Sequence, residues 1–409
     1  MKKAISAIKQ KTKKLLSHQE LGIQLDLYSF HEISPGAPFW HPKGMVIFRE
    51  LEKAIRETLD KQDYQEISTP IMVRKDLFEK SGHFEFYKEL MFTLKVDNQI
   101  FVLKPMNCPE STIIYSSKIR SWRDLPLRFS EIGRLHRKEL SGVLNGLFRV
   151  RQITMDDAHI YARIDELVGE INQLIVLINS FYKIFNFKTS YFLATRPDKA
   201  MGEKKLWDKA EDALASALKQ NKIKYELQPK EGAFYGPKIE IHVKDSLGRA
   251  WQLGTIQVDF NMAEKFNLSF ANQKGEKEKP VIIHRAVFGS FERFIGILVE
   301  NYQGAFPVWL SPVQVRVLNL TDRNQKYAEK IYKELKNSGI RVELDDTNET
   351  VGKKIREAEL EKIPYILIVG DKEEKNDSVA VRERSKGDLG SQKLSDFLQK
   401  IKKGIESKI

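Results

Sequence analysis

One run of the sequence, residues 129–161, brings arginine, aspartate and histidine together with turn residues, and its pattern predicts two strands joined by a long loop. The dipeptides Ser141-Gly142 and Asn145-Gly146 mark the reversal. Alternation places six side chains on one face of the returning strand: Arg149, Arg151, Ile153, Met155, Asp157 and His159. Guanidinium groups suit phosphate oxygens, whereas aspartate and histidine suit a metal ion or a polar substrate. The alternative for this run alone is a solvated face with charges of both signs.

Three side chains far apart in the sequence could bind a metal ion together. His159 and His284 follow or end strand-like runs rich in polar residues, and Cys108 lies between prolines in the sequence KPMNCP. A Cys-His-His set suits zinc and leaves coordination open for a substrate. The spacing carries no metal signature of its own, so buried structural side chains are the alternative.

The composition is that of a globular protein with two to three domains. A net charge of +12 favours a polyanionic partner. The single cysteine excludes an internal disulfide framework. The apolar runs are too short to span a membrane. Residues 1–20 are rich in lysine and contain no arginine, which is atypical of organelle presequences, so we expect a solvated helix and a cytoplasmic protein.

The elements that must position these side chains follow from periodicity and turn signals. The first part of the chain is irregular over residues 21–41 and has a loop histidine, His83, before aromatic residues. We expect helices at 44–60, 111–122, 164–185, 204–221 and 289–300, extended segments at 64–72, 191–194, 239–243, 251–260 and 281–284, and a hairpin at 92–103. Arg293 then lies in the first turn of its helix, where backbone N–H groups already favour an anion.

A second pattern begins after Pro307 and Pro312. Strands at 313–320, 341–344, 365–369 and 379–384 alternate with helices at 324–337, 351–362 and from 394 onward. This alternation predicts a small α/β domain with a largely parallel sheet.

Gln252 and Gln257 have opposite parity on one predicted strand. Both can reach the same pocket only if that strand contains a bulge, for which Gly254 is the best position.

Six motifs resemble those of bacterial threonyl-tRNA synthetases, a class II aminoacyl-tRNA synthetase family, from about residue 21 to the C-terminus. They are KPMNCP around Cys108, HRKELSG around Arg137, RVRQITMDDAHIY around Asp157 and His159, FYGPKIE around Lys238, HRAVFGSFERFIG at 284–296 and KIPYILIVGDKE from Lys362. The resemblance implies an α+β fold, in which an antiparallel sheet flanked by helices precedes an α/β anticodon-binding domain. The domains expected are a Lys-rich helix at 1–20, a catalytic domain at 21–310 and the anticodon-binding domain at 311–409.

The resemblance also implies the activity and the roles of individual residues. The protein would activate L-threonine with ATP and transfer it to the 3′ end of tRNA(Thr), as a homodimer whose interface includes the helix before Pro70. Arg137 would bind the α-phosphate and Arg293 the γ-phosphate, with Mg²⁺ bridging the phosphates. The other ATP-side residues implied are Glu139 at the adenine amine, Arg149 over the nucleotide, and Lys238, Gln252 and Ser290.

Zinc held by Cys108, His159 and His284 would select threonine, because it can take the amino and hydroxyl groups together. An apolar pocket separates near isosteres such as threonine and valine by only about 100-fold. Further side chains implied at the amino acid are Met106, Asp157, Tyr235 and Gln257. His83 would assist the transfer to tRNA, and Asn348, Glu373 and Arg382 would read the anticodon.

The sequence departs from the family pattern in three places. We expect the protein to lack two N-terminal domains of the family, one of which edits mischarged serine, and therefore to form mischarged Ser-tRNA that it cannot clear. Glu110-Ser111 stands where Gly-His is common, and Met155 where Gln is common. A catalytically inactive RNA-binding paralogue and a class II synthetase for serine or proline are the alternatives; the retained zinc ligands and motif arginines argue against the first.

Overall fold

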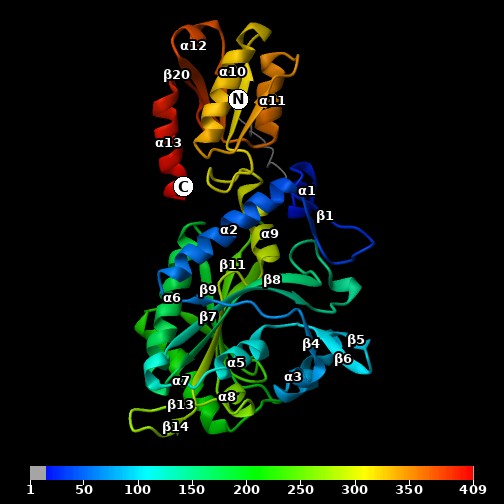
Figure 1. Ribbon diagram of the computed structural model, residues 1–409, viewed down its shortest axis with the longest axis vertical. Coiled ribbons are helices and arrows are strands. Elements are labelled where there is room, and N and C mark those ends of the chain that lie inside the picture. The colour runs from blue at the N-terminus through cyan, green and yellow to red at the C-terminus, as the bar shows by residue number, and fades with distance from the viewer. Residues whose placement is uncertain (1–14, 409) are drawn as a thin grey trace, which may run out of the picture.

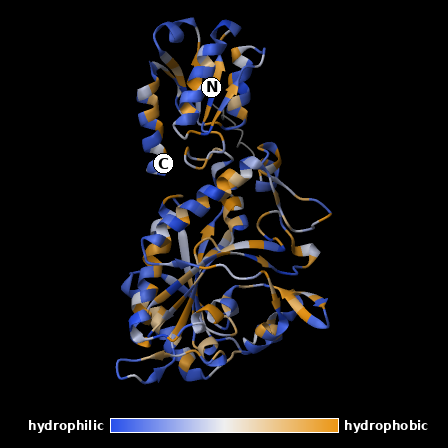
Figure 2. Cartoon of the chain, in the orientation of Figure 1, coloured by the Kyte–Doolittle hydropathy of each residue, from blue (hydrophilic) through white to orange (hydrophobic). Residues whose placement is uncertain are grey.

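The computed structural model describes residues 15–408 and places them in two parts, shown in Figure 1. Within these residues the lower part is built on an 8-stranded sheet and the upper, C-terminal part on a 5-stranded sheet. Figure 2 shows hydrophobic residues along the strands of both sheets, as expected for strands covered by helices. No helix in the described range is long and apolar enough to cross a membrane.

The large sheet is antiparallel except at its two edges, where β10 runs parallel to β9 and β3 runs parallel to β7. In spatial order its strands are β10 (Tyr225–Gln228), β9 (Thr189–Ala194), β11 (Lys238–Lys244), β12 (Ala250–Asp259), β15 (Val281–Ala286), β8 (Gln152–Ala162), β7 (Leu127–His136) and β3 (Gln65–Glu66). The predicted α+β class and the mostly antiparallel sheet are therefore confirmed.

Side chains alternate between two packed layers along each inner strand. On β8, Ala158 and Ile160 belong to a core shared with the helical layer, whereas Tyr161 packs in a second core on the opposite face. The helices that contribute most residues to the first core are α2 (Pro42–Asp60), α6 (Leu167–Lys183), α7 (Lys204–Gln220) and α9 (Phe291–Tyr302). His159 and Asp157 share the parity of Tyr161 and so point away from the helical layer.

The second layer contains shorter elements, and two of them differ from the predictions. Its members are β4 (Met72–Arg74), α3 (Lys75–Lys80), α4 (His83–Tyr87), β5 (Phe92–Val96), β6 (Gln99–Leu103), α5 (Cys108–Ser116), α8 (Asn261–Lys265), β13 (Phe270–Ala271) and β14 (Lys277–Glu278). His83 begins a short helix instead of lying in a loop. The helix predicted at 111–122 begins at Cys108, because Pro109 is tolerated in a first turn, where its missing N–H has no intrahelical partner.

Strands β7 and β8 pair without interruption from Leu127 opposite Tyr161 to His136 opposite Gln152, as the sequence predicts. One detail of the predicted face is wrong. Arg151 precedes the strand, and its guanidinium group donates to the carbonyls of Glu139 and Pro35 and to Ser141 Oγ. Strand alternation does not extend to Arg151, because these loop acceptors fix its side chain.

The predicted bulge in β12 is confirmed. Ile241 of β11 lies opposite Gly254, and the next residue, His242, lies opposite Gln252, so Leu253 is the extra residue. Gln252 and Gln257 consequently line the same cavity despite their opposite parity.

The C-terminal sheet is less parallel than predicted. Its spatial order is β17 (Val342–Asp345), β16 (Val315–Asn319), β18 (Tyr365–Val369), β19 (Ser378–Glu383) and β20 (Gly387–Lys393). The first three strands pair in parallel. Strand β19 pairs antiparallel with β18, and the unpredicted β20 pairs antiparallel with β19. The short segment between β18 and β19, which holds α12 (Asp371–Lys375), cannot make the crossover of a dozen residues that a parallel strand requires. The other helices here are α10 (Gln325–Asn337), α11 (Val351–Leu360) and α13 (Leu394–Glu406).

Helix α2 joins the two parts of the molecule through side chains spaced seven residues apart. Lys43 Nζ lies 2.8 Å from Glu361, Glu50 lies 2.6 Å from Arg341 Nη1, and Glu57 lies 3.1 Å from Lys408 Nζ. A seven-residue spacing keeps these groups on one side of the helix. In Figure 1, α2 lies between the large sheet and the C-terminal part.

The N-terminal segment packs on the large part of the molecule. Helix α1 (His18–Gln24) precedes β1 (Tyr28–Ser29) and β2 (Phe39–Trp40), in a region predicted to be irregular. Most of the predicted Lys-rich helix lies outside the described residues, and the expected domain boundary at residue 20 falls inside α1. His18 and Leu21 are buried because α1 packs on the large part of the molecule. The lysine content of the segment does not indicate this burial.

Candidate active site and metal centre

A row of polar side chains crosses the middle of the large sheet. Lys238 on β11 pairs with Gln257 on β12, Gln257 pairs with His284 on β15, and His284 pairs with His159 on β8. Directly paired residues project to the same face of a sheet, so the strand register alone brings these four side chains together.

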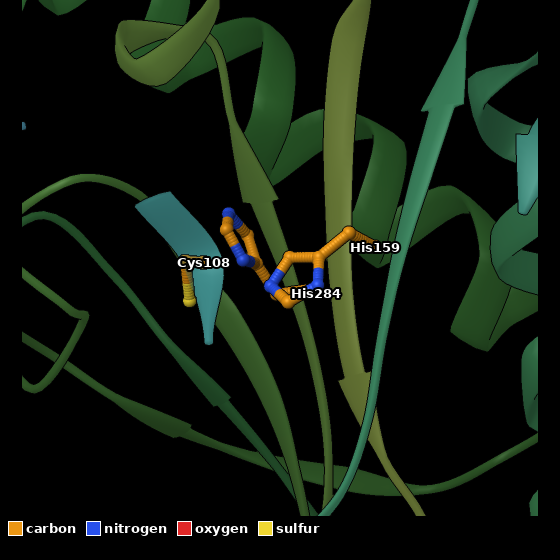
Figure 3. Close-up of side chains that lie close together, drawn as sticks. All are labelled: Cys108, His159 and His284. Carbon is orange, nitrogen blue, oxygen red and sulfur yellow. The ribbon is translucent and has the colours of Figure 1, made fainter. Parts of the chain in front are cut away.

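Cys108 completes a cluster with the two histidines of this row. One possible ligand atom from each of Cys108, His159 and His284 lies within 4.8 Å of the other two, and all three residues are buried. Figure 3 shows the imidazole rings meeting with the thiol beside them. Cys108 reaches this position because α5 begins over the sheet at that point.

The surroundings of the cluster fit a metal ion. His284 Nε2 lies 3.2 Å from the carboxylate of Asp259, whereas its Nδ1 is buried and finds no partner among the described residues. The Asp259 contact orients the ring and leaves the Nδ1 lone pair as a ligand. A soft thiolate with two imidazoles is a donor set that binds Zn²⁺.

Burial sets the protonation of the cluster when no cation is bound. Desolvation, and then the neighbouring His284, holds the pKa of His159 well below its usual value, so this imidazole is neutral and can coordinate. Desolvation, and then Asp157, raises the pKa of the Cys108 thiol. Binding a divalent cation at this site therefore requires that the thiol lose its proton.

The cluster forms one end of a cavity of about 610 Å³. The cavity is lined by every residue that was predicted for the catalytic domain: His83, Met106, Cys108, Arg137, Glu139, Arg149, Asp157, His159, Tyr235, Lys238, Gln252, Gln257, His284, Ser290 and Arg293. These residues come from segments that span two hundred positions of the sequence, and the sheet brings them together.

Three arginines converge away from the cluster. Burial, and then the nearby charges of Arg137 and Arg149, hold the pKa of Arg293 below its usual value. Backbone carbonyls fix two of them: Arg137 Nε donates to Pro105, and Arg293 Nε donates to Phe148, at 3.2 and 3.1 Å. Arg149 lies 3.4 Å from the carboxylate of Glu139. This end of the cavity suits a polyanion.

The region beside the cluster is polar and buried. Asn107 Nδ2 donates to Asp157 at 2.9 Å, and burial raises the pKa of Asp157 to about 6. Tyr235 donates its hydroxyl hydrogen to Gln257. Burial, and then His284, lowers the pKa of His83 to about 3, so that ring is neutral at physiological pH.

Several residues of the site were not predicted. Asn107, Phe148 and Thr255 orient predicted side chains or line the cavity, and Asn107 could have been singled out from the motif around Cys108. At the departure from the family pattern, Glu110 is buried, burial raises its pKa to about 8, and neither carboxylate oxygen has a hydrogen-bond partner in the described part of the chain. Ser111 Oγ lies 2.8 Å from the Tyr161 hydroxyl.

The three residues predicted to read an anticodon lie on separate elements of the C-terminal part. Asn348 is exposed in the loop before α11. Glu373, in α12, accepts from Ser391 Oγ at 2.8 Å, and Arg382, on β19, donates to Glu359 at 3.3 Å.

Two family models match the chain. Residues 92–302 match the tRNA synthetase class II core domain (G, H, P, S and T), and residues 314–404 match an anticodon binding domain. The large antiparallel sheet with its cavity is thus the core of a class II aminoacyl-tRNA synthetase.

The relatives narrow the family further. The chain is 52% identical over 391 residues to the threonine–tRNA ligase of Carboxydothermus hydrogenoformans, and 51% identical to that of Caldanaerobacter subterraneus subsp. tengcongensis, in both cases over 96% of its own length. The solved RNA binding domain of threonyl-tRNA synthetase from Cryptosporidium parvum Iowa II has a TM-score of 0.92 and 37% identity, over 95% of this chain and 98% of that one. The chain belongs to the threonyl-tRNA synthetase family. It spans 62% and 61% of the lengths of these two curated relatives.

The metal centre makes a direct prediction. Cys108→Ala removes one of three donors, so zinc bound after dialysis should fall from about one equivalent per chain to a small fraction of that. Metal analysis of the purified protein measures this. Ser111→Ala, in the same helix but outside the cluster, is the control and should keep its zinc. An alanine variant at Cys108 that holds as much zinc as the unaltered chain would rule out the site.

Proposed function

We propose that the chain is a threonine–tRNA ligase that forms threonyl-adenylate and transfers the threonyl group to tRNA(Thr). The observation that carries this proposal is the arrangement of the cavity, which has a Cys-His-His cluster at one end and three arginines at the other. The family membership supports it, because these relatives bear that activity in their names.

In the first step the threonine carboxylate attacks the α-phosphorus of ATP, forming a new P–O bond while the bond to pyrophosphate breaks. The nucleophile is already anionic, so the reaction requires alignment and charge neutralisation more than a base. Arg137 neutralises the α-phosphate and Arg293 the γ-phosphate, with Mg²⁺ bound to the nucleotide. Glu139 accepts from the adenine amine and Arg149 covers the nucleotide, while Lys238, Gln252 and Ser290 contact the nucleotide or the adenylate.

Selectivity for threonine arises at the end of the cavity that contains the Cys-His-His cluster. Cys108, His159 and His284 would hold zinc, and the bound ion would act as a Lewis acid toward the amino and hydroxyl groups of threonine. Asp157, held by Asn107, accepts the hydrogen bond of that hydroxyl group, and Tyr235 and Gln257 line the amino acid. Met106 borders the same space. Valine lacks the hydroxyl group and would leave these buried polar groups unpaired.

In the second step the 3′ adenosine hydroxyl of tRNA attacks the adenylate carbonyl. A C–O ester bond forms, the bond to phosphate breaks, and AMP leaves. His83 is neutral and lines the cavity, so it can accept a hydrogen bond from the attacking hydroxyl and orient it, while the proton leaves with the phosphate of AMP.

Pyrophosphate exchange with different amino acids tests the activation step. Threonine should support exchange, valine should be disfavoured by more than about 100-fold, and serine should be activated weakly, because it also carries a hydroxyl group. Arg137→Ala should lower kcat by about 100-fold or more, because its charge acts on the transition state. Exchange with proline but not threonine would contradict the proposal.

The C-terminal part would bind the anticodon loop, whose unstacked bases can be read on their edges. Asn348, Glu373 and Arg382 are the residues proposed for this role, and the match to an anticodon binding domain supports it.

A tRNA(Thr) transcript with an altered anticodon should be charged about 5- to 150-fold less efficiently, since one lost base contact costs roughly 1–3 kcal/mol. Aminoacylation assays measure this, and pyrophosphate exchange, which needs no tRNA, is the internal control. Equal charging of both transcripts would contradict anticodon reading by this chain.

The chain would work as a homodimer through the edge of the large sheet at β3. The segment after this strand exposes apolar side chains, with Ile71 at 43% and Met72 at 46%. An exposed strand edge beside an apolar patch supports pairing with a second copy.

Sedimentation velocity should give a dimer, and the double substitution Ile71→Glu and Met72→Glu should shift the protein to monomer, because two carboxylates would be buried against apolar surface. Replacing Ile119, an exposed apolar residue at 99%, by glutamate is the control and should leave the dimer intact. A monomer at micromolar concentration for the unaltered chain would exclude this interface.

A further inference from the structure

His18 is a buried histidine that the catalytic residues described above do not include. It is the first residue of α1 and is 2% exposed. It lies outside residues 92–302, which match the class II core. Its ring nevertheless reaches the end of the loop between β7 and β8.

The hydrogen bonds of His18 define its protonation and tautomer. The backbone N–H of Leu147 donates to His18 Nε2 at 3.1 Å, so Nε2 carries no hydrogen. His18 Nδ1 lies 2.8 Å from Glu300 Oε1 and therefore donates to that carboxylate. The ring is thus neutral, with its hydrogen on Nδ1.

Glu300 is itself fixed, so His18 has a rigid support. The carboxylate is 1% exposed on α9, the helix that carries Arg293. It also accepts from the backbone N–H of His18 at 3.0 Å and from Arg249 Nη2 at 3.0 Å. An imidazole held in this way can orient the group that donates to its other nitrogen.

His18 orients the backbone N–H of Leu147, and the next two residues, Phe148 and Arg149, line the cavity at its arginine end. Phe148, the residue after Leu147, packs its ring 4.0 Å from the His18 ring and 4.4 Å from Trp251, measured between centroids. The carbonyl of Phe148 accepts from Arg293 Nε at 3.1 Å, and the next residue is Arg149. Immediately after the bond to His18, the returning arm of the loop therefore brings two groups to the cavity, the Phe148 carbonyl and the Arg149 side chain.

Gly146 shows how closely the loop backbone approaches the ring. It has a φ of +47°, and a Cβ at this position would lie 2.3 Å from His18 Nε2. Only glycine brings the backbone this near to the imidazole without displacing it.

We propose that His18 is a positioning residue for nucleotide binding: its neutral imidazole, held by Glu300, accepts the Leu147 N–H and so fixes the loop arm that carries Phe148 and Arg149. This inference rests on the proposed function, in which Arg149 covers the nucleotide. It adds a residue of the N-terminal segment to the machinery that binds ATP.

Two substitutions separate the two bonds of the ring. Glutamine places an acceptor near the position of Nε2, so His18→Gln keeps the bond to Leu147 and loses the donor to Glu300. Asparagine places a donor near Nδ1, so His18→Asn keeps the bond to Glu300 and loses the acceptor. We expect His18→Asn to raise the KM for ATP about tenfold, the equivalent of one buried hydrogen bond, with the KM for threonine unchanged.

His18→Gln should keep the KM for ATP within about twofold of the unaltered chain, although it loses a bond of comparable strength. His41→Gln, in the same segment and bonded to Asp26 at 2.6 Å, is the control and should leave both KM values unchanged. Pyrophosphate exchange provides these values, and thermal unfolding compares the two His18 variants. Equal KM values for ATP in the two variants would overturn the inference.

Hydrogen exchange on the unaltered chain keeps the inference testable if both variants fail to fold. The Leu147 amide should be strongly protected, and exchange as fast as that of an open loop amide would overturn the proposed bond. A chain that supports no threonine-dependent exchange would instead overturn the proposed function, whatever the variants do.

Discussion

The pairing of β8 with β15 is the constraint on which the site depends. It sets His159 directly opposite His284, and the pairing of β15 with β12 then sets Gln257 in the same row. A shift of one residue in either pairing would turn these side chains into the helical core, because strand side chains alternate between the two faces. The strong hydrophobic alternation on β8, where Ala158, Ile160 and Ala162 enter that core, therefore also fixes the two histidines of the candidate metal centre.

The arginine end of the cavity depends on charge and on backbone carbonyls instead of strand register. Arg137, Arg149 and Arg293 are held close to one another, and burial, followed by the charges of the other two arginines, lowers the pKa of Arg293. Backbone carbonyls hold Arg137 and Arg293, so these two side chains are oriented before a ligand arrives. A triphosphate would relieve the repulsion and would find its partners preorganised, which is how fixed charges contribute to catalysis.

The two parts of the molecule and the N-terminal segment are joined to this site through helices. The ion pairs of α2 with Arg341, Glu361 and Lys408 link the C-terminal part to a helix that packs on the large sheet. Helix α9 carries Arg293 at one end and Glu300, the support of His18, at the other. The position of one cavity arginine and the contact with the N-terminal segment are thus set by one helix.

The sequence by itself determined the elements and most of the candidate site. Hydrophobic periodicity, turn dipeptides and six motifs predicted the hairpin, the α+β class and the bulge near Gly254, since these depend on neighbours along the chain. The tertiary structure alone decided the position of Arg151, the antiparallel β19 and β20, and the burial of His18 under the loop. Those features depend on partners distant in sequence: the carbonyls of Pro35 and Glu139, a connection too short for a crossover, and the Leu147 amide 129 residues away. A local sequence pattern contains no information about such distant partners, so only the tertiary structure identifies them.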